Sequence, residues 1–244
     1  MPITNSETHT RIDEIASGIF RISTPIPSSP ALPGGFSFNQ FLIVDDQPLL
    51  FHTGPKRLFP VVRQAVSSVI GPERLSFVGF SHTEGDESGS LLEWLAAAPN
   101  ARPLCSRVAA MVYADDATER AALAMVDGET LVLGERTVRW FDAPHVPHGW
   151  DCGFLGETST ATLFCGDLFT QPGADHPPIT DSEVLGPSEA MRKQLDYYAH
   201  APTTRDALER LASFEPRVLA CMHGAAYRGD GAAHLRALAA ALTN

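Results

Sequence analysis

Residue types that bind metal ions are concentrated in the segment SHTEGDESGS at 81–90, where His82, Glu84 and Asp86 alternate along the chain. In an extended backbone, alternate side chains point to the same side, so these three are expected to converge. The apolar run LSFVGF at 75–80, which precedes them, is typical of a buried strand. Carboxylates desolvated at its end would repel one another without a compensating positive charge. The spacing therefore indicates a cation-binding loop.

A solvated turn explains the same segment without a metal ion. In that interpretation Glu84, Asp86 and Glu87 face water, and Ser88 caps the helix that follows. Residues elsewhere in the chain must distinguish the two interpretations.

Further ligand-type residues stand at the ends of predicted strands in the second half of the chain. Asp167 follows the run TATLFC, and His223 closes the run RVLACMH just before Gly224. The segment PHVPH offers both His145 and His148, and either could reach a metal ion. Loops at strand ends commonly present functional side chains, which favours the metal interpretation.

The remaining histidines are weaker candidates. His52 follows an early apolar strand; it is either a core histidine satisfied by a backbone carbonyl, which we favour, or a donor that orients a metal ligand. The others are expected to face solvent or to be structural, and they are His9, His176, His200 and His234.

Apolar periodicity and turn residues predict short strands and helices along the whole chain. Strands are predicted at 18–23, 38–44, 48–53, 75–80, 103–106, 130–134, 137–144, 151–157, 160–167 and 217–223. Helices are predicted at 56–70, 91–98, 187–200, 203–213 and 234–242, with one or two short helices within 107–125.

This alternation favours an α/β (α+β) fold with two packed sheets flanked by helices over a doubly wound parallel sheet. Both halves begin with antiparallel-looking strands and end in strand-loop-helix units. The proline-rich segment TPIPSSPALPGG at 24–35 is interpreted as a loop rather than a linker. We therefore expect residues 1–244 to form a single domain with two similar halves.

Composition excludes several classes of partner. The formal net charge is −11 and no cluster of lysine or arginine stands out, which argues against nucleic acid and anionic lipid. The N-terminus lacks the basic start and apolar core of a signal peptide, and no apolar run reaches the roughly 18 residues of a membrane span. We expect a cytoplasmic protein with no membrane attachment.

Four cysteines are widely spaced and lack the C-x-x-C pattern of zinc or redox motifs. Cys105, Cys152, Cys165 and Cys221 are therefore expected to be reduced core thiols. The alternative is a redox or metal-proximal role for Cys165, which lies two residues from Asp167.

The loop at 82–91, HTEGDESGSL, resembles the H-x-E-x-D-H-x-G-S-L motif of flavodiiron proteins, which are oxygen- and nitric-oxide-reducing members of the metallo-β-lactamase superfamily. The resemblance extends from about residue 15 to 230. It includes NQFLIVDDQPLLFHTG, PHGWDCGFLGE with TLFCGDLFTQ, and LDYYAHAPTTRDALERLASFEPRVLACMHGAAYRG. It implies a four-layer αββα metallo-β-lactamase-like sandwich.

The same resemblance implies a ligand set. His82, Glu84 and His148 would hold one metal ion, and His148 rather than His145 matches the motif. Asp86, His223 and a further residue would hold the second ion, with Asp167 bridging. Hydrolytic zinc members carry a histidine where Glu84 stands, and the harder oxygen ligand shifts the preference toward iron. Two iron ions are thus the expected cofactor, ahead of zinc or manganese.

Two features of this sequence leave alternatives open. Glu87 stands where the family motif has a histidine, and it either binds the second metal ion or points away from it. Tyr197 and Tyr198 match paired tyrosines of the family, and they either donate a hydrogen bond near a bound oxygen species or serve packing.

The leading hypothesis is a non-haem di-iron protein that binds or reduces O2, NO or peroxide, as a sensor or a reductase. The sequence ends about 20 residues after His223, so no flavin site and a separate electron-donor or signalling protein are expected. The resemblance also allows a homodimer. The alternative is a metal-dependent hydrolase acting on an ester, thioester, lactone or phosphodiester.

Overall fold

The strands form two sheets in the computed structural model, which describes residues 3–30 and 32–243. Four residues lie outside the described ranges: 1, 2, 31 and 244. All four belong to the expected domain, and Ala31 also belongs to the expected loop. The first sheet has the order β1 (Ile3–Asn5), β2 (Thr10–Ala16), β3 (Ile19–Ile26), β4 (Phe36–Ile43), β5 (Leu49–Phe51), β6 (Phe77–Gly79), β7 (Arg102–Ser106) and β8 (Leu123–Met125). Pairing is antiparallel from β1 to β5 and parallel from β5 to β8.

The second sheet comes from the other half of the chain. Its order is β13 (Ile179–Thr180), β15 (Ala226–Arg228), β14 (Val218–Ala220), β12 (Thr162–Phe164), β11 (Gly153–Glu157), β10 (Thr137–Asp142) and β9 (Thr130–Val132). β12 pairs with β14 in parallel, so the ends of both strands present their following residues at one edge of the sheet.

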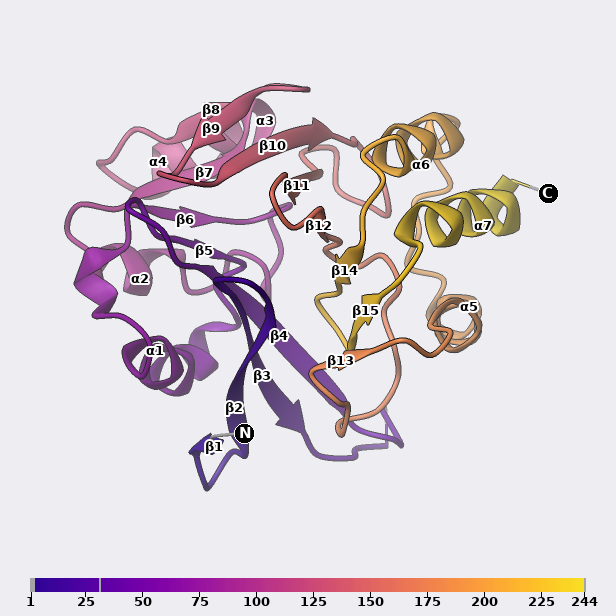
Figure 1. Cartoon of the computed structure of the whole chain (residues 1–244), viewed down its shortest axis with the longest axis horizontal. Coiled ribbons are helices and arrows are strands. Elements are labelled where there is room, and N and C mark those ends of the chain that lie inside the picture. Colours follow the sequence, from indigo (N-terminus) through magenta and orange to yellow (C-terminus); the bar gives the residue numbers. More distant parts are fainter. Residues whose placement is uncertain (1–2, 31, 244) are drawn as a thin grey trace.

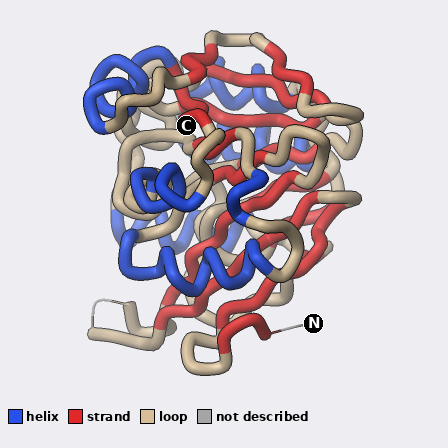
Figure 2. Tube along the Cα trace, turned by 90° about the vertical axis from the view of Figure 1, so that its left-hand side faces the viewer, coloured by secondary structure: helices blue, strands red, loops and turns tan. Residues whose placement is uncertain are grey.

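Helices cover the outer faces of the two sheets (Figure 1). Their bounds are η1 (Lys56–Leu58), α1 (Phe59–Ser67), η2 (Pro72–Arg74), α2 (Leu91–Ala97), α3 (Arg107–Ala109), the π-helical turn η3 (Ala110–Ala114), α4 (Asp115–Ala117), α5 (Leu185–Leu195), α6 (Thr204–Ala212) and α7 (Gly231–Thr243). Figure 2 shows helices in front of the strands when the molecule is seen from the side of α1 and α2. Among the described residues, no helix combines the length and apolar character needed to cross a membrane.

Apolar side chains fill the space between the sheets. Phe41 of β4 and Phe51 of β5 meet Phe164 of β12 with ring centroids 5.4 and 5.5 Å away. Each sheet also packs on its own helices, through Trp94 on the first sheet and Leu208 on the second. The expected arrangement of two packed sheets flanked by helices is thereby confirmed.

The sequence missed β1, β2, β8, β13 and β15 and misplaced the ends of several helices, among them α1, α5 and α7. In β2 a bulge between Glu14 and Ala16 disrupts the period-two pattern, so Ile12 and Ile15 do not alternate as in a regular strand. The helix predicted at 187–200 ends at Leu195, because Asp196 adopts a left-handed conformation with φ of 49°. The predicted loop at 24–35 begins only after β3 ends at Ile26.

Candidate metal centre

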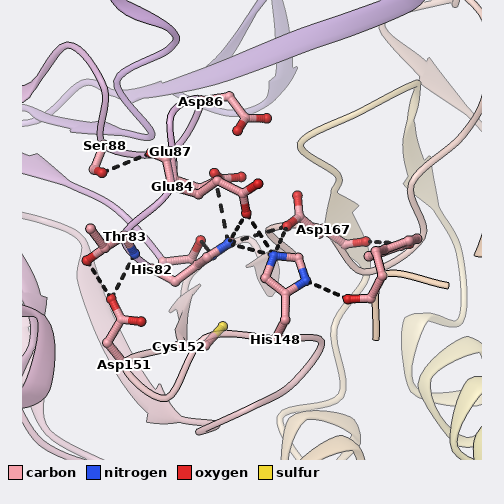
Figure 3. Close-up of polar contacts among 12 residues, drawn as sticks. His82, Thr83, Glu84, Asp86, Glu87, Ser88, His148, Asp151, Cys152 and Asp167 are labelled. Carbon is pink, nitrogen blue, oxygen red and sulfur yellow. Dashed lines mark hydrogen bonds and ion pairs between the residues drawn. The ribbon is translucent and has the colours of Figure 1, made fainter. Parts of the chain in front are cut away.

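The loop that carries the alternating ligands is fixed by its neighbours. Thr53 N donates to Glu87 O at 2.8 Å, and Gly54 N donates to Asp86 O at 3.0 Å. On the other side, Thr83 donates from both its backbone N and its Oγ1 to Asp151 Oδ2, at 2.8 and 2.6 Å. These contacts hold the loop at the end of β6 in one conformation, and Figure 3 shows the side chains of His82 and Glu84 directed toward those of His148 and Asp167.

Four donors meet at a first position: His82, Glu84, His148 and Asp167, whose ligand atoms all lie within 4.8 Å of one another. Glu84 Oε2 lies 3.0 Å from His82 Nε2 and 2.8 Å from His148 Nε2 (Figure 3). The two imidazole nitrogens lie 3.0 Å apart. Two imidazoles and two carboxylates at these separations match a mixed nitrogen and oxygen coordination sphere.

A second position lies beside the first and contains Asp86, Glu87 and His223, again with ligand atoms within 4.8 Å. His223 Nε2 lies 3.3 Å from Asp86 Oδ2 and 3.2 Å from Asp167 Oδ1. The other oxygen of Asp167, Oδ2, lies 3.3 Å from His148 Nε2. Asp167 therefore faces both positions with one oxygen each, as a bridging carboxylate would.

The imidazoles of the three histidine ligands are each oriented through Nδ1, the ring nitrogen that does not face the centre. His148 Nδ1 donates to Tyr197 O at 2.9 Å, and His223 Nδ1 donates to Ser37 O at 2.8 Å. His82 Nδ1 lies 3.0 Å from Ser81 Oγ. Because Nδ1 is engaged in all three rings, Nε2 is left as the atom directed into the centre.

His52 extends this support and corrects the preferred expectation for this residue. Its Nε2 lies 3.1 Å from Ser81 Oγ, the same hydroxyl that contacts His82, so a serine rather than a backbone carbonyl is its partner. His52 is fully buried, and burial lowers its pKa to about 3. The neutral ring thus supports His82 through Ser81, as a residue that orients a metal ligand does.

The charges of the site call for a cation. Neither carboxylate oxygen of Glu87 has a hydrogen-bond partner within the described part of the chain, although the side chain is fully buried. Burial and the carboxylates of Asp167 and Asp86 raise the pKa of Glu87 well above its ordinary value. An unpaired buried carboxylate is costly unless a positive charge compensates it. The donors present therefore fit a metal centre.

The histidines respond to the same excess of negative charge. Burial lowers the pKa of His223, but hydrogen bonds to Asp167 and Asp86 outweigh burial and raise the pKa to about 10. Hydrogen bonds to His148 and His82 lower the pKa of Glu84 to about 2. A bound cation would supply the positive charge that these imidazoles otherwise obtain by taking up protons, and its binding would release those protons.

A cavity of about 180 Å³ opens onto the donors. Glu84, Asp86, His148, Asp167 and His223 form its polar side, and Phe36, Thr170, Leu195 and Tyr197 form the rest of its lining. Phe36 stacks on the ring of His223 with a centroid distance of 4.2 Å. The volume is below the roughly 300–1,000 Å³ of pockets that bind drug-sized organic molecules, so the cavity suits a small ligand.

The other predicted site residues differ in whether they lie at the cavity. Tyr197 lines the cavity, and its hydroxyl donates to Asp167 O at 3.2 Å. Tyr198 packs in the hydrophobic core on the helical side of the second sheet and does not line the cavity, which favours the packing alternative for this residue. His145 is exposed and belongs to neither donor group among the described residues.

The peripheral histidines lie away from the metal donors, and the cysteines are buried, as expected. His9 and His200 are exposed, while His176 and His234 are partly buried and lie away from the donors. All four cysteines are free and buried, which confirms the prediction of core thiols. The metal-proximal alternative named Cys165, but Cys152 is the cysteine that lies close enough to His82 for a side-chain hydrogen bond.

Several supporting residues were not predicted from the sequence. Ser37, Ser81 and Asp151 hold the ligands or their loop, and Ser106 Oγ in turn donates to Asp151 O at 2.7 Å. Only the position of Asp151, three residues after His148, hinted at such a role. The serines carried no recognisable spacing signal.

Known proteins share both the sequence pattern and the fold. A family model described as ODP family beta lactamase matches residues 36–224. The chain is 27% identical over 208 residues to rubredoxin-oxygen oxidoreductase from Megalodesulfovibrio gigas, covering 81% of this chain and 50% of that protein. It is 26% identical to the anaerobic nitric oxide reductase flavorubredoxin from Vibrio vulnificus, covering 80% of this chain and 41% of that protein.

A solved structure of rubredoxin oxygen:oxidoreductase from Desulfovibrio gigas superposes with a TM-score of 0.81 at 24% identity, over 94% of this chain and 60% of that chain. At this identity the superposition shows the shared fold. The chain spans about half the length of the rubredoxin-oxygen oxidoreductase that it matches.

Proposed function

The chain belongs to the ODP family of beta lactamases, and from this membership we propose that it is a non-haem iron protein that binds O2 or NO in the cavity and reduces it. The observation that carries the proposal is the convergence of three oriented imidazole Nε2 atoms with four carboxylates, five of these donors lining a small cavity. Seven donors in two groups that share Asp167 suit two neighbouring metal ions.

The composition of the first position supports iron there. Glu84 contributes a carboxylate alongside the imidazoles of His82 and His148, and mixed nitrogen and oxygen donors suit iron. Iron, when bound, would supply the electrons and the open coordination positions that reduction of a diatomic molecule requires. Two relatives carry names that describe oxygen or nitric oxide reduction, which supports the same chemistry for this chain. An electron-donor protein would deliver these electrons to the iron.

The residues of the chain have defined tasks in this proposal. Asp167 holds the two positions together and balances their charge. Phe36 and Leu195 make part of the cavity wall apolar, which favours an uncharged diatomic ligand over a bulky or anionic substrate. Burial raises the pKa of Tyr197, so its hydroxyl keeps its proton and its hydrogen bond to Asp167 O at neutral pH.

Consumption of O2 and NO tests the proposal. Protein reconstituted anaerobically with iron and reduced by a chemical donor is expected to consume O2 or NO in proportion to the reductant. His148→Ala should abolish this consumption because it removes a donor of the first position. His145→Ala is the matched control, since His145 lies in the same loop but is exposed and outside the donor groups, and it should retain full activity.

Two other outcomes would contradict the proposal. Stable binding of O2 without consumption of reductant would indicate a sensor. Zinc at both positions, together with turnover of an ester, lactone or phosphodiester under anaerobic conditions, would indicate a hydrolase, the alternative drawn from the fold.

A further inference from the structure

Glu87 is a fully buried carboxylate in which both oxygens need a partner. Neither oxygen accepts a hydrogen bond from any residue that the structure describes. The backbone on either side is fixed, because Thr53 N donates to Glu87 O and Gly54 N donates to Asp86 O. A bond from only one oxygen to a metal ion would leave the other oxygen buried and unpaired, which is costly.

The Glu87 carboxylate contacts donors of both metal positions. Its Oε2 lies 4.0 Å from Nε2 of His82, a donor of the first position. It also has an oxygen within 4.8 Å of the donor atoms of Asp86 and His223, and it is close enough to the Asp86 carboxylate for a side-chain hydrogen bond if one of the two is protonated. Asp167 shows the same pattern, with Oδ2 3.5 Å from His82 Nε2 and Oδ1 3.2 Å from His223 Nε2. Glu87 is therefore placed as a bridging carboxylate would be.

Glu87 and Asp167 approach the centre from different sides. Asp167 lines the cavity, as do four of the other donors. His82 and Glu87 are the two donors of the described residues that do not line it, and they are 2% and 0% exposed. A bridge through Glu87 would thus close the protein side of the metal pair and leave the cavity side open to a diatomic ligand.

The charge of the site fits two ions that share Glu87. The two donor groups contain four carboxylates, whose four negative charges equal the positive charges of two ferrous ions. In a buried site each charge must lie against its counter-charge. Glu87 meets this requirement at both oxygens either by chelating one ion or by bridging two, and its contact with His82 favours the bridge.

We propose that Glu87 is a second bridging carboxylate, with one oxygen bound to the iron at the first position and the other bound to the iron at the second. Together with Asp167 it fixes the separation of the two irons. This inference rests on the proposed iron-binding function and assigns Glu87 to both positions of that centre, whereas a terminal ligand would serve the second position alone.

Diffraction from iron-loaded crystals tests the bridge directly. The full chain is loaded anaerobically with ferrous ions and crystallised, and the iron sites are located by anomalous scattering at the iron absorption edge. We expect one Glu87 oxygen bonded to each iron at about 2.0–2.2 Å, the usual length for a carboxylate on a divalent transition metal. A Glu87 side chain bonded to only one iron, or to neither, would overturn the inference.

The ferrous affinity of the first position gives an independent test. The double variant Asp86→Ala/His223→Ala removes donors of the second position only. Adding Glu87→Gln to this background should raise the dissociation constant for ferrous iron by about tenfold or more, measured by competition with a chromophoric chelator. Glu135→Gln in the same background is the matched control, since Glu135 is exposed and outside both donor groups of the described chain.

Equal dissociation constants with Glu87→Gln and with Glu135→Gln would overturn the inference, because a bridging carboxylate must contribute to the first position. If the triple variant with Glu87→Gln does not fold, diffraction from the wild-type chain decides alone. Two irons bridged by Asp167 only, in a protein that still consumes O2 or NO, would overturn the inference and leave the proposed function standing. A chain that binds iron at neither position and consumes neither gas would overturn both.

Discussion

Each of the three imidazoles of the metal centre is oriented by a contact at its Nδ1 atom. The residues that make these contacts come from distant parts of the chain. Ser37, Ser81 and the carbonyl of Tyr197 engage the three Nδ1 atoms. The ligands themselves were predictable from the sequence, because ligand types and spacing repeat a recognisable pattern. Their supports were not, since a serine or a backbone carbonyl acquires its partner only through the fold.

Ser81→Ala should weaken metal binding at the first position. The variant removes the hydroxyl between His52 and His82, so the His82 ring loses the contact that fixes its orientation. We expect the dissociation constant for ferrous iron to rise by about tenfold, measured by competition with a chromophoric chelator. Ser67→Ala, in which an exposed helix hydroxyl is lost, is the control. Equal affinities in the two variants would refute a supporting role for Ser81.

The turn after β14 shows how a backbone element places a ligand. His223 and Gly224 follow this strand, and Gly224 O accepts hydrogen bonds from Arg21 of β3 at 2.7 Å and Asn39 of β4 at 2.9 Å. The first sheet thus holds a turn that belongs to the second. Strand RVLACMH was predictable from its apolar run, but Arg21 and Asn39 lie 203 and 185 residues away from Gly224 in sequence, so no local pattern could reveal them.

Gly224→Ala should destabilise the protein. Gly224 has φ of +97°, and an added Cβ would lie 2.6 Å from the Cβ of buried Gln171. We expect the free energy of unfolding, measured by urea denaturation without metal, to fall by about 1–3 kcal/mol. Gly85→Ala is the control, because an added Cβ there meets no atom within 4 Å. A loss as large in Gly85→Ala as in Gly224→Ala would contradict this interpretation.

The whole molecule places the centre where loops from both sheets meet. The loop carrying His82 follows β6 of the first sheet, whereas Asp167 and His223 follow β12 and β14 of the second. The order of predicted strands and helices was sufficient to predict two packed sheets. It did not reveal β13 or β15, because strands of two and three residues are too short to show a period-two pattern, and β13 finds its partner, β15, only in a later part of the chain.

Phe164→Ala should weaken the packing of one sheet on the other. Its ring is fully buried and contacts Phe41 and Phe51 of the opposite sheet. We expect a loss of about 3–5 kcal/mol in the free energy of unfolding, measured by urea denaturation. Val132→Ala, which truncates a side chain that is 57% exposed, should cost little. Similar losses in both variants would argue against an inter-sheet core at this point.

The number of metal ions bound per chain tests the central claim, that seven donors form two adjacent positions. Protein loaded anaerobically with ferrous ions and then desalted is measured by elemental mass spectrometry against protein concentration. We predict close to two ions per wild-type chain, one for each donor group, and about one in the double variant Asp86→Ala/His223→Ala, which removes donors of the second position only. One ion or fewer per wild-type chain, or no difference between wild type and the double variant, would contradict the account.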